Sequence, residues 1–258
     1  MKLMQTLISL KTLTYKELHR ILRIWPQTLL PPVITTVLYF AIFGKLVGAQ
    51  IHSIQGYTYM QFIVPGLVLM PIITNSYMNT SFSFYMAKFQ GNLQEILVSP
   101  MPSSIILAGY VLGGMFRALI IGAIVLVVAT LFTHITITHA VLTFIVAVIT
   151  AMLFSIIGLL NGIVARSWDD VSLIPSFVLT PLTYLGGVFY SLSQLPQWGQ
   201  IASRFNPIYY VIDLFRGELL NSHEHTSNRV AFSLILSLTL ALFVLALHQL
   251  RYSKKLRS

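Results

Sequence analysis

The stretch THAVLTFIVAVITAMLFSIIGLLNGIVA, residues 138–165, decides the fold of this 258-residue chain. It contains no Lys, Arg, Asp or Glu. It is also longer than the about 20 apolar residues that a helix needs to cross the hydrocarbon core of a bilayer. The stretch therefore predicts a transmembrane helix. Comparable stretches lie on either side of it, and the six predicted spans are residues 29–48, 58–82, 103–132, 138–165, 171–191 and 229–250.

Composition supports an integral membrane protein. Hydrophobic residues make up 56% of the chain and charged residues 9%, whereas about a quarter of a soluble domain is charged. We expect an all-α polytopic membrane protein with a single transmembrane domain over residues 1–258. The absence of cysteine excludes disulfides and thiolate chemistry. The net charge is +9, and the basic residues lie beside the spans instead of forming a stripe on a soluble fold. We therefore expect membrane lipid and no nucleic acid as a partner.

The distribution of Lys and Arg predicts the orientation, because cytoplasmic loops carry an excess of these residues. With the N-terminus inside, eleven of the sixteen Lys and Arg residues are cytoplasmic, four are outside and Arg117 lies within a span. Both termini are therefore predicted to be cytoplasmic in a multi-pass protein. The cytoplasmic set is Lys2, Lys11, Lys16, Arg20, Arg23, Lys88, Arg166, Arg251, Lys254, Lys255 and Arg257.

The segment before the first span, residues 1–28, is predicted to contain an amphipathic helix in the plane of the headgroups. At helical spacing, its apolar residues fall on one face and its basic residues on the opposite face. The alternative is a solvated cytoplasmic tail. The apolar face is formed by Leu18, Ile21, Leu22 and Trp25, and the basic face by Lys16, Arg20 and Arg23.

Two connections differ from plain loops. Residues 83–101 are predicted to form a short cytoplasmic helix with Lys88 and Glu95 on one face, two turns apart, although it could be a simple surface helix. Residues 194–228 are too long for a tight outer turn, and Asn206-Pro207 divides their apolar part. We expect two short re-entrant helices there.

Small and polar residues within the spans indicate helix packing and a transport route. Two small-xxx-small pairs predict close packing of spans three and four, with subunit association as the alternative; they are Gly109 with Gly113 and Gly158 with Gly162. Polar residues of spans two and five predict the walls of a pathway, with interhelical hydrogen bonding as the alternative. The pathway candidates are Asn75, Asn79, Thr180 and Tyr184.

Arg117 lies near the middle of span three, where a charge is costly. We expect Arg117 to form a structural ion pair with Asp213 or Glu218, either of which a re-entrant hairpin could bring close to it. The alternative is that Arg117 contacts a substrate.

Several motifs are absent from the 258 residues. There is no GxSxG or HExxH motif, so no catalytic residues are expected. The sequence His223-Glu224-His225 specifies too few ligands, so no metal site is expected. No G-x-x-x-x-G-K-[ST] loop is present to bind ATP, and no intramembrane carboxylate pair supports proton coupling. A membrane subunit driven by another protein is therefore expected; a secondary transporter or a structural scaffold is the alternative.

Four blocks resemble the ABC-2 family of ABC transporter permeases. They are YMQFIVPG (59–66), FQGNLQEILVSP (89–100), TPLTYLGGVFY (180–190) and FNP (205–207), and the similarity extends over the whole length. The resemblance implies an exporter with a second copy of the chain and two separate ABC ATPase subunits, which carry ATP and Mg. It implies a location in a bacterial inner membrane and no cofactor in this chain.

The resemblance also implies roles for the unusual segments. Residues 84–98 would be the coupling helix, with Glu95 at its acidic position, and residues 200–220 would be the outer re-entrant helices. Spans one, two and five would line the route at the dimer interface. The family exports lipids, glycolipids, polysaccharides and hydrophobic drugs, so the resemblance leaves the substrate open among these.

Overall fold

The computed structural model describes residues 2–44, 53–54, 56–221 and 228–252. Within these residues the regular structure is helical, apart from an isolated bridge between Ile54 and Tyr57. The helices are α1 (Lys2–Arg23), α2 (Trp25–Ile42), α3 (Tyr59–Phe89), α4 (Asn92–Val98), α5 (Ser103–Phe132), α6 (Ala140–Val164), α7 (Trp168–Ile174), α8 (Thr180–Tyr184), α9 (Gln197–Arg204), α10 (Pro207–Leu220) and α11 (Asn228–Tyr252).

Four of the described helices are long and apolar enough to cross a membrane. They are α3, α5, α6 and α11, which confirms the spans predicted at 58–82, 103–132, 138–165 and 229–250 as helices of sufficient length. The first predicted span corresponds to α2, which contains 18 residues and includes Pro26, Pro31 and Pro32. The chain is therefore polytopic, whereas a count of six spans stays a prediction.

The fifth predicted span, 171–191, is not one regular helix. It consists of α7, a π-helical turn at Pro175–Leu179 and α8, followed by turns. Pro175 and Pro181 have no backbone N–H, so the regular hydrogen-bond ladder cannot run through them. The Thr180 hydroxyl donates to the Pro175 carbonyl at 2.9 Å and so satisfies an oxygen at this irregular turn.

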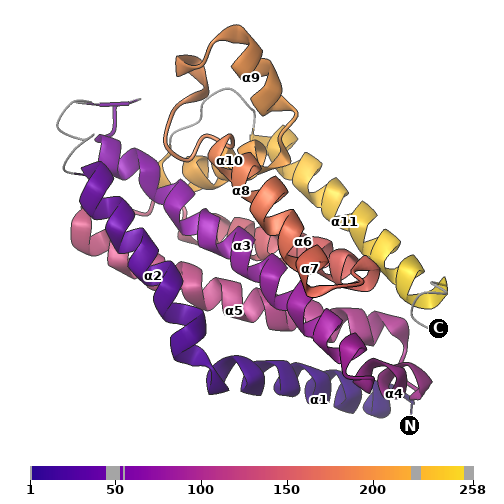
Figure 1. The fold of residues 1–258 in the computed structure, drawn as a ribbon. Helices are drawn as coiled ribbons and strands as arrows, with labels where there is room; N and C mark the ends of the chain where they lie inside the picture. The colour runs from indigo at the N-terminus through magenta and orange to yellow at the C-terminus, as the bar shows by residue number, and fades with distance from the viewer. Residues whose placement is uncertain (1, 45–52, 55, 222–227, 253–258) are drawn as a thin grey trace.

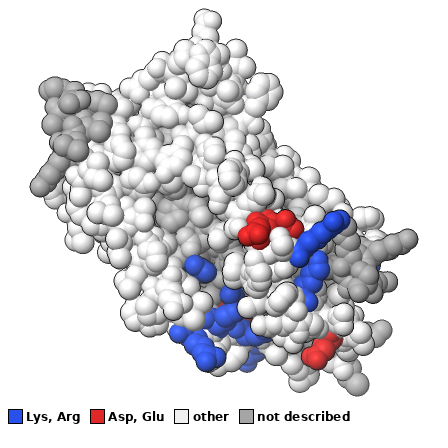
Figure 2. Space-filling view, viewed as in Figure 1, with Lys and Arg blue, Asp and Glu red and all other residues white. Residues whose placement is uncertain are grey.

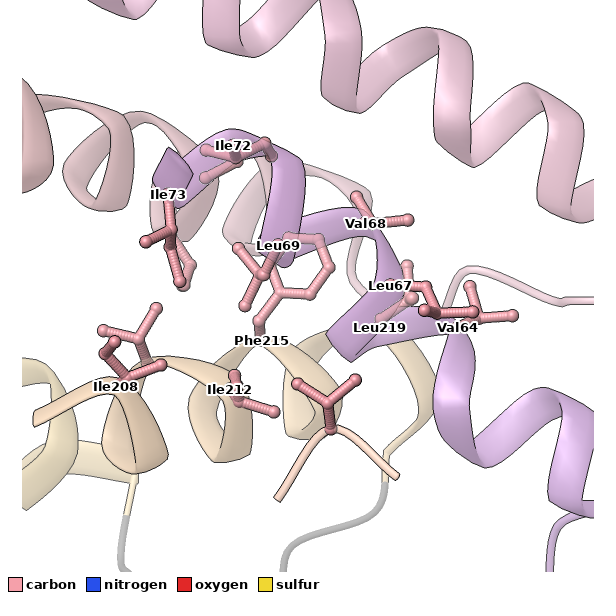
Figure 3. Close-up of a cluster of buried hydrophobic side chains, with 14 of the residues drawn as sticks. Val64, Leu67, Val68, Leu69, Ile72, Ile73, Ile208, Ile212, Phe215 and Leu219 are labelled. Carbon is pink, nitrogen blue, oxygen red and sulfur yellow. The ribbon is translucent and has the colours of Figure 1, made fainter. Parts of the chain in front are cut away.

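Helix α3 forms the centre of the bundle and packs against both α5 and α6, which also pack against each other (Figure 1). Most of its side chains are buried. Figure 3 shows the apolar side chains of α3 facing those of α10, where Leu69 lies near Phe215 and Ile73 near Ile208. Burial of these groups on both helices keeps α10 against the core.

The predicted break at Asn206-Pro207 is confirmed, since α9 ends at Arg204 and α10 begins at Pro207. The Asn206 side chain accepts a hydrogen bond from the Ile208 N–H at 3.0 Å and donates to the Leu182 carbonyl at 2.6 Å. The α10 side chains are largely buried in the bundle, whereas Trp198 on α9 is exposed. The depth of these helices in a membrane stays a prediction.

The predicted cytoplasmic helix was wrong in its extent. Helix α3 continues to Phe89, and the chain turns at Gly91, whose φ of 78° is unfavourable for a residue with a side chain. Lys88 and Glu95 therefore lie on two different helices and not on one face of a single helix. Only Asn92–Val98 forms the separate short helix α4.

The N-terminal segment forms helix α1, and its place in the headgroup plane stays a prediction. Helix α1 packs along α5, and the residues buried there are Leu13, Glu17 and Ile21. Leu22 and Trp25 remain exposed, and Trp25 belongs to α2 because the first helix ends at Arg23. The stripe of α1 that the bundle buries therefore includes a carboxylate.

The start of α1, helix α4 and the end of α11 lie at the same end of the molecule, while α9 lies at the opposite end (Figure 1). Figure 2 shows charged side chains, mostly Lys and Arg, gathered near the end that holds α1 and α4. The rest of this face is largely uncharged apart from a small acidic patch.

Candidate functional site

A cavity of about 350 Å³ lies between α2 and α3 and opens to the surface. Arg117 of α5 is the charged residue on its wall. The remaining walls combine apolar side chains with hydroxyl and amide groups. The lining residues are Gln27, Thr28, Pro31, Pro32, Thr35, Thr36 and Tyr39 of α2, Leu67, Met70, Pro71, Thr74, Asn75 and Met78 of α3, and Arg117.

The predicted pairing of Arg117 with Asp213 or Glu218 was wrong. No described acidic side chain forms an ion pair with Arg117, and its Nε has no hydrogen-bond partner. Glu218 instead accepts a hydrogen bond from the Asn228 side chain at 2.8 Å, and Asp213 lies buried within α10. The hairpin is held to the bundle by other contacts, so it does not bring its carboxylates to the cavity.

Arg216 of α10, which lies in the predicted outer segment 194–228, makes one of these contacts. Its guanidinium lies 3.9 Å from the centre of the Phe62 ring and donates to the Gly187 carbonyl at 2.6 Å. It is 1% exposed. A planar cation stacked on an aromatic face retains favourable electrostatics after it loses water.

The two asparagines predicted for the pathway occupy different places. Asn75 lines the cavity and donates to the Pro71 carbonyl at 2.9 Å. Asn79, one turn further along α3, accepts a hydrogen bond from Arg20 at 2.9 Å and is not on the cavity wall.

The residues predicted from span five also lie outside the cavity lining. The Thr180 hydroxyl is engaged in its hydrogen bond to the Pro175 carbonyl at the π-helical turn. The Tyr184 hydroxyl lies 2.8 Å from that of Tyr39, which does line the cavity. Tyr184 therefore reaches the cavity only through Tyr39.

Sequence reasoning missed the polar side of α2 and the role of Glu17. Thr28, Thr35 and Thr36 recur at helical spacing of seven and eight, a signal that a pattern search along the first span could have found. Glu17 is fully buried and accepts hydrogen bonds from Ser83 at 2.8 Å and from Arg20 at 2.9 Å. A lone acid in a basic segment gave no signal of this burial.

The four predicted packing glycines have different partners from those expected. A Cβ added at Gly109 would lie 2.5 Å from the Leu13 side chain, and one at Gly113 would lie 2.7 Å from that of Glu17. This pair of span three therefore faces α1 and not span four. Gly158 and Gly162 of α6 instead face the α3 backbone, with distances from an added Cβ of 2.3 Å to the Tyr77 oxygen and 2.9 Å to the Ser81 oxygen.

Charged side chains form hydrogen bonds with unpaired backbone groups at two helix ends. The Lys88 ammonium donates to the carbonyls of Ile163 and Ala165, at 3.3 and 3.1 Å, where α6 ends. The Arg166 and Ser167 N–H groups donate hydrogen bonds to the Asp170 carboxylate. These bonds, and chiefly the one from Arg166, hold the pKa of Asp170 below its usual value. Glu95, by contrast, is exposed on α4.

The sequence His223-Glu224-His225, judged insufficient for a metal site, lies outside the described residues.

Comparison with known proteins identifies the family. The family described as "ABC-2 type transporter" matches residues 8–220. The inner membrane transport permease YadH of Escherichia coli K12 is 52% identical over 217 residues, which cover 84% of this chain and 85% of that protein. Nodulation protein J of Rhizobium leguminosarum bv. trifolii is 25% identical over 185 residues, 71% of each chain. The chain therefore belongs to the ABC-2 type transporter family, as its transmembrane permease subunit, with the ATPase on a separate subunit.

Proposed function

We propose that this chain forms the membrane pathway of an ATP-driven exporter in a bacterial inner membrane. The observation that carries the proposal is the cavity between α2 and α3, which places hydroxyls and a cation beside α3 and α5, two helices long and apolar enough to span a bilayer. Its mixed walls suit a lipid-like, glycan or hydrophobic substrate. The names of the relatives support this proposal, since one is an inner membrane transport permease.

The complex we propose contains two copies of this chain and two ABC ATPase subunits that bind ATP and Mg. Each copy forms one transmembrane domain of six spans. The segments around these spans are the N-terminal helix within 1–28, the coupling segment 83–101 and the outer segment 194–228. Both termini are cytoplasmic. The gathering of Lys and Arg near α1 and α4 supports this orientation.

Helix α4 is the element we propose to contact the ATPase. It connects α3, which lines the cavity, to α5, which carries Arg117. Leu93 anchors one side of α4 in the core, while Glu95 is exposed on the helix. Lys88 already binds the end of α6, so Glu95 is the better candidate for an electrostatic contact with a basic partner.

The coupling proposal is tested by reversing the charge at Glu95. Purification in mild detergent should retain an ABC ATPase, and reconstituted vesicles should show ATP hydrolysis that the permease stimulates. Glu95→Lys should fold and insert normally but lower this stimulation about tenfold or more, since losing one partner of an interfacial charge pair often costs about 2–5 kcal/mol. Asp169→Lys, at an exposed acid of α7, is the matched control and should behave as wild type.

Two outcomes would contradict these proposals. Full stimulation by Glu95→Lys would remove α4 from the coupling route. Transport that follows a proton gradient, in a preparation that never retains an ATPase, would overturn the ATP-driven exporter itself.

A further inference from the structure

The cavity between α2 and α3 contains an uncompensated positive charge. Arg117 has no ion pair with a described residue, and its buried Nε lacks a hydrogen-bond partner. The nearby charged group acting on it is Arg20, which is also positive. Arg20 is neutralised by Glu17 at 2.9 Å, so that carboxylate is already engaged.

A lone cation is costly at this depth in a membrane protein. Ionisable residues inside transmembrane segments usually pair with another group or mark the pathway of a substrate or ion. Arg117 lies on α5, a helix long and apolar enough to cross the bilayer, and it faces the cavity. An anionic ligand would supply the partner that the described protein residues do not.

Arg117 is the charged donor on this wall, and Gln27 and Thr35 add neutral donors. The hydroxyls of Thr28, Thr36 and Thr74 donate to carbonyls of their own helices, at 3.1, 2.9 and 2.9 Å. The Asn75 amide likewise donates to Pro71. These side chains keep oxygen atoms that can accept hydrogen bonds, whereas the guanidinium can donate to an anion.

The rest of the wall fits an apolar chain. Pro31, Pro32, Leu67, Met70 and Met78 provide a mostly apolar surface around the charge. Thioether side chains adapt to irregular apolar shapes. A guanidinium binds phosphate or carboxylate oxygens in a two-pronged geometry that an ammonium cannot reproduce.

We propose that this cavity binds an anionic amphiphile, with Arg117 holding its phosphate or carboxylate head group and the apolar walls holding its chain. The inference rests on the proposed function, because it names the chemical class of the exported molecule.

The test measures binding of defined probes to the full chain purified in a neutral detergent, with any ATPase that it retains. Dodecyl phosphate represents the anionic amphiphile, dodecylphosphocholine has the same chain with a zwitterionic head, and inorganic phosphate represents the free anion. Dissociation constants from calorimetric titration should show wild type binding dodecyl phosphate at least about tenfold more tightly than either other probe.

Variants then locate the site. Arg117→Gln should weaken dodecyl phosphate binding by about tenfold or more, Arg117→Lys should restore part of it, and Arg166→Gln should leave it unchanged. Arg166→Gln is the matched control because Arg166 is exposed on the connection after α6. Thr35→Phe keeps Arg117 but fills the cavity, so it should also weaken binding. This variant decides the question if Arg117→Gln does not fold.

Each remaining outcome overturns the proposal. Equal binding of dodecyl phosphate by folded Arg117→Gln or Thr35→Phe and wild type would place the ligand elsewhere. Equal wild-type affinity for dodecylphosphocholine would remove the requirement for net negative charge, and equal affinity for inorganic phosphate would make the ligand a free anion. Glu95→Lys should bind the probe as wild type does, so failure of ATPase coupling and failure of this site are separable.

Discussion

Gly158 is the position where adding a single methyl group should be most damaging. A Cβ there would lie 2.3 Å from the Tyr77 carbonyl oxygen and 3.0 Å from the Tyr77 Cα, both backbone atoms of α3. Neither atom can rotate away, so α6 and α3 must separate. Gly122 offers a matched control in α5, because its added Cβ would meet only side-chain atoms of Ile72, and a cavity of about 250 Å³ that both residues line gives that side chain room to move.

The expected magnitude follows from two opposing terms. Replacing a helical glycine by alanine gains about 1 kcal/mol from helix propensity. Overpacking a close interface costs about 1–3 kcal/mol, and contact with rigid backbone belongs at or above the upper limit. Gly158→Ala should therefore lower the free energy of unfolding by about 2 kcal/mol, while Gly122→Ala should change it by less than about 1 kcal/mol.

The assay is reversible unfolding in mixed detergent micelles, followed by circular dichroism and by the yield of monodisperse protein. The two alanine variants are compared at the same detergent ratio. If Gly158→Ala matches or exceeds the stability of both wild type and Gly122→Ala, the α3 and α6 backbones are not in close contact there, and the packing argument fails.

The remaining predictions concern two charged groups. Glu17→Ala removes the carboxylate partner of Arg20 and should lower the unfolding free energy by about 2 kcal/mol in the same assay, less than for a fully buried pair because Arg20 is 33% exposed and keeps its bond to Asn79. Glu95→Ala at an exposed site should change it by less than about 0.5 kcal/mol, and equal effects of the two variants would refute the buried network. The pKa of Asp170 is lowered by folding, so its stabilising contribution is present above its ordinary pKa of 3.8 and is lost as the pH falls through the lower folded value. Wild type should exceed Asp170→Asn in stability at pH 6 and lose this advantage in acid, and a pH-independent difference would contradict the assignment.

Hydropathy was sufficient to predict the long helices, because a bilayer imposes a minimum length on any apolar span. The stretch around residues 138–165 became α6, and the asparagine before Pro207 divided the outer segment as expected. Both signals are local: one depends on apolar length and the other on the missing N–H of proline. Local signals of this kind need no knowledge of neighbouring helices.

Partner choice could not be predicted in the same way. Gly109 and Gly158 have the same small-residue pattern, yet one faces α1 and the other α3, because a glycine specifies close approach and not the helix that approaches. Asn75 and Asn79 lie one turn apart, and only the position of α1 decides that Asn79 binds Arg20. The helical period also could not indicate that Gly91 would end α3 between Lys88 and Glu95.

The packing of the helices indicates which wall of the cavity moves more easily. Helix α3 is held firmly, since it packs along both α5 and α6 and is joined to α1 by the Ser83–Glu17 hydrogen bonds. Helix α2 packs mainly on α5 and touches α3 only slightly across the cavity. Separating α2 from α3 therefore disrupts less packing than moving α3 within the bundle. Of the two main cavity walls, α2 is the one expected to move, while α3 and Arg117 remain fixed.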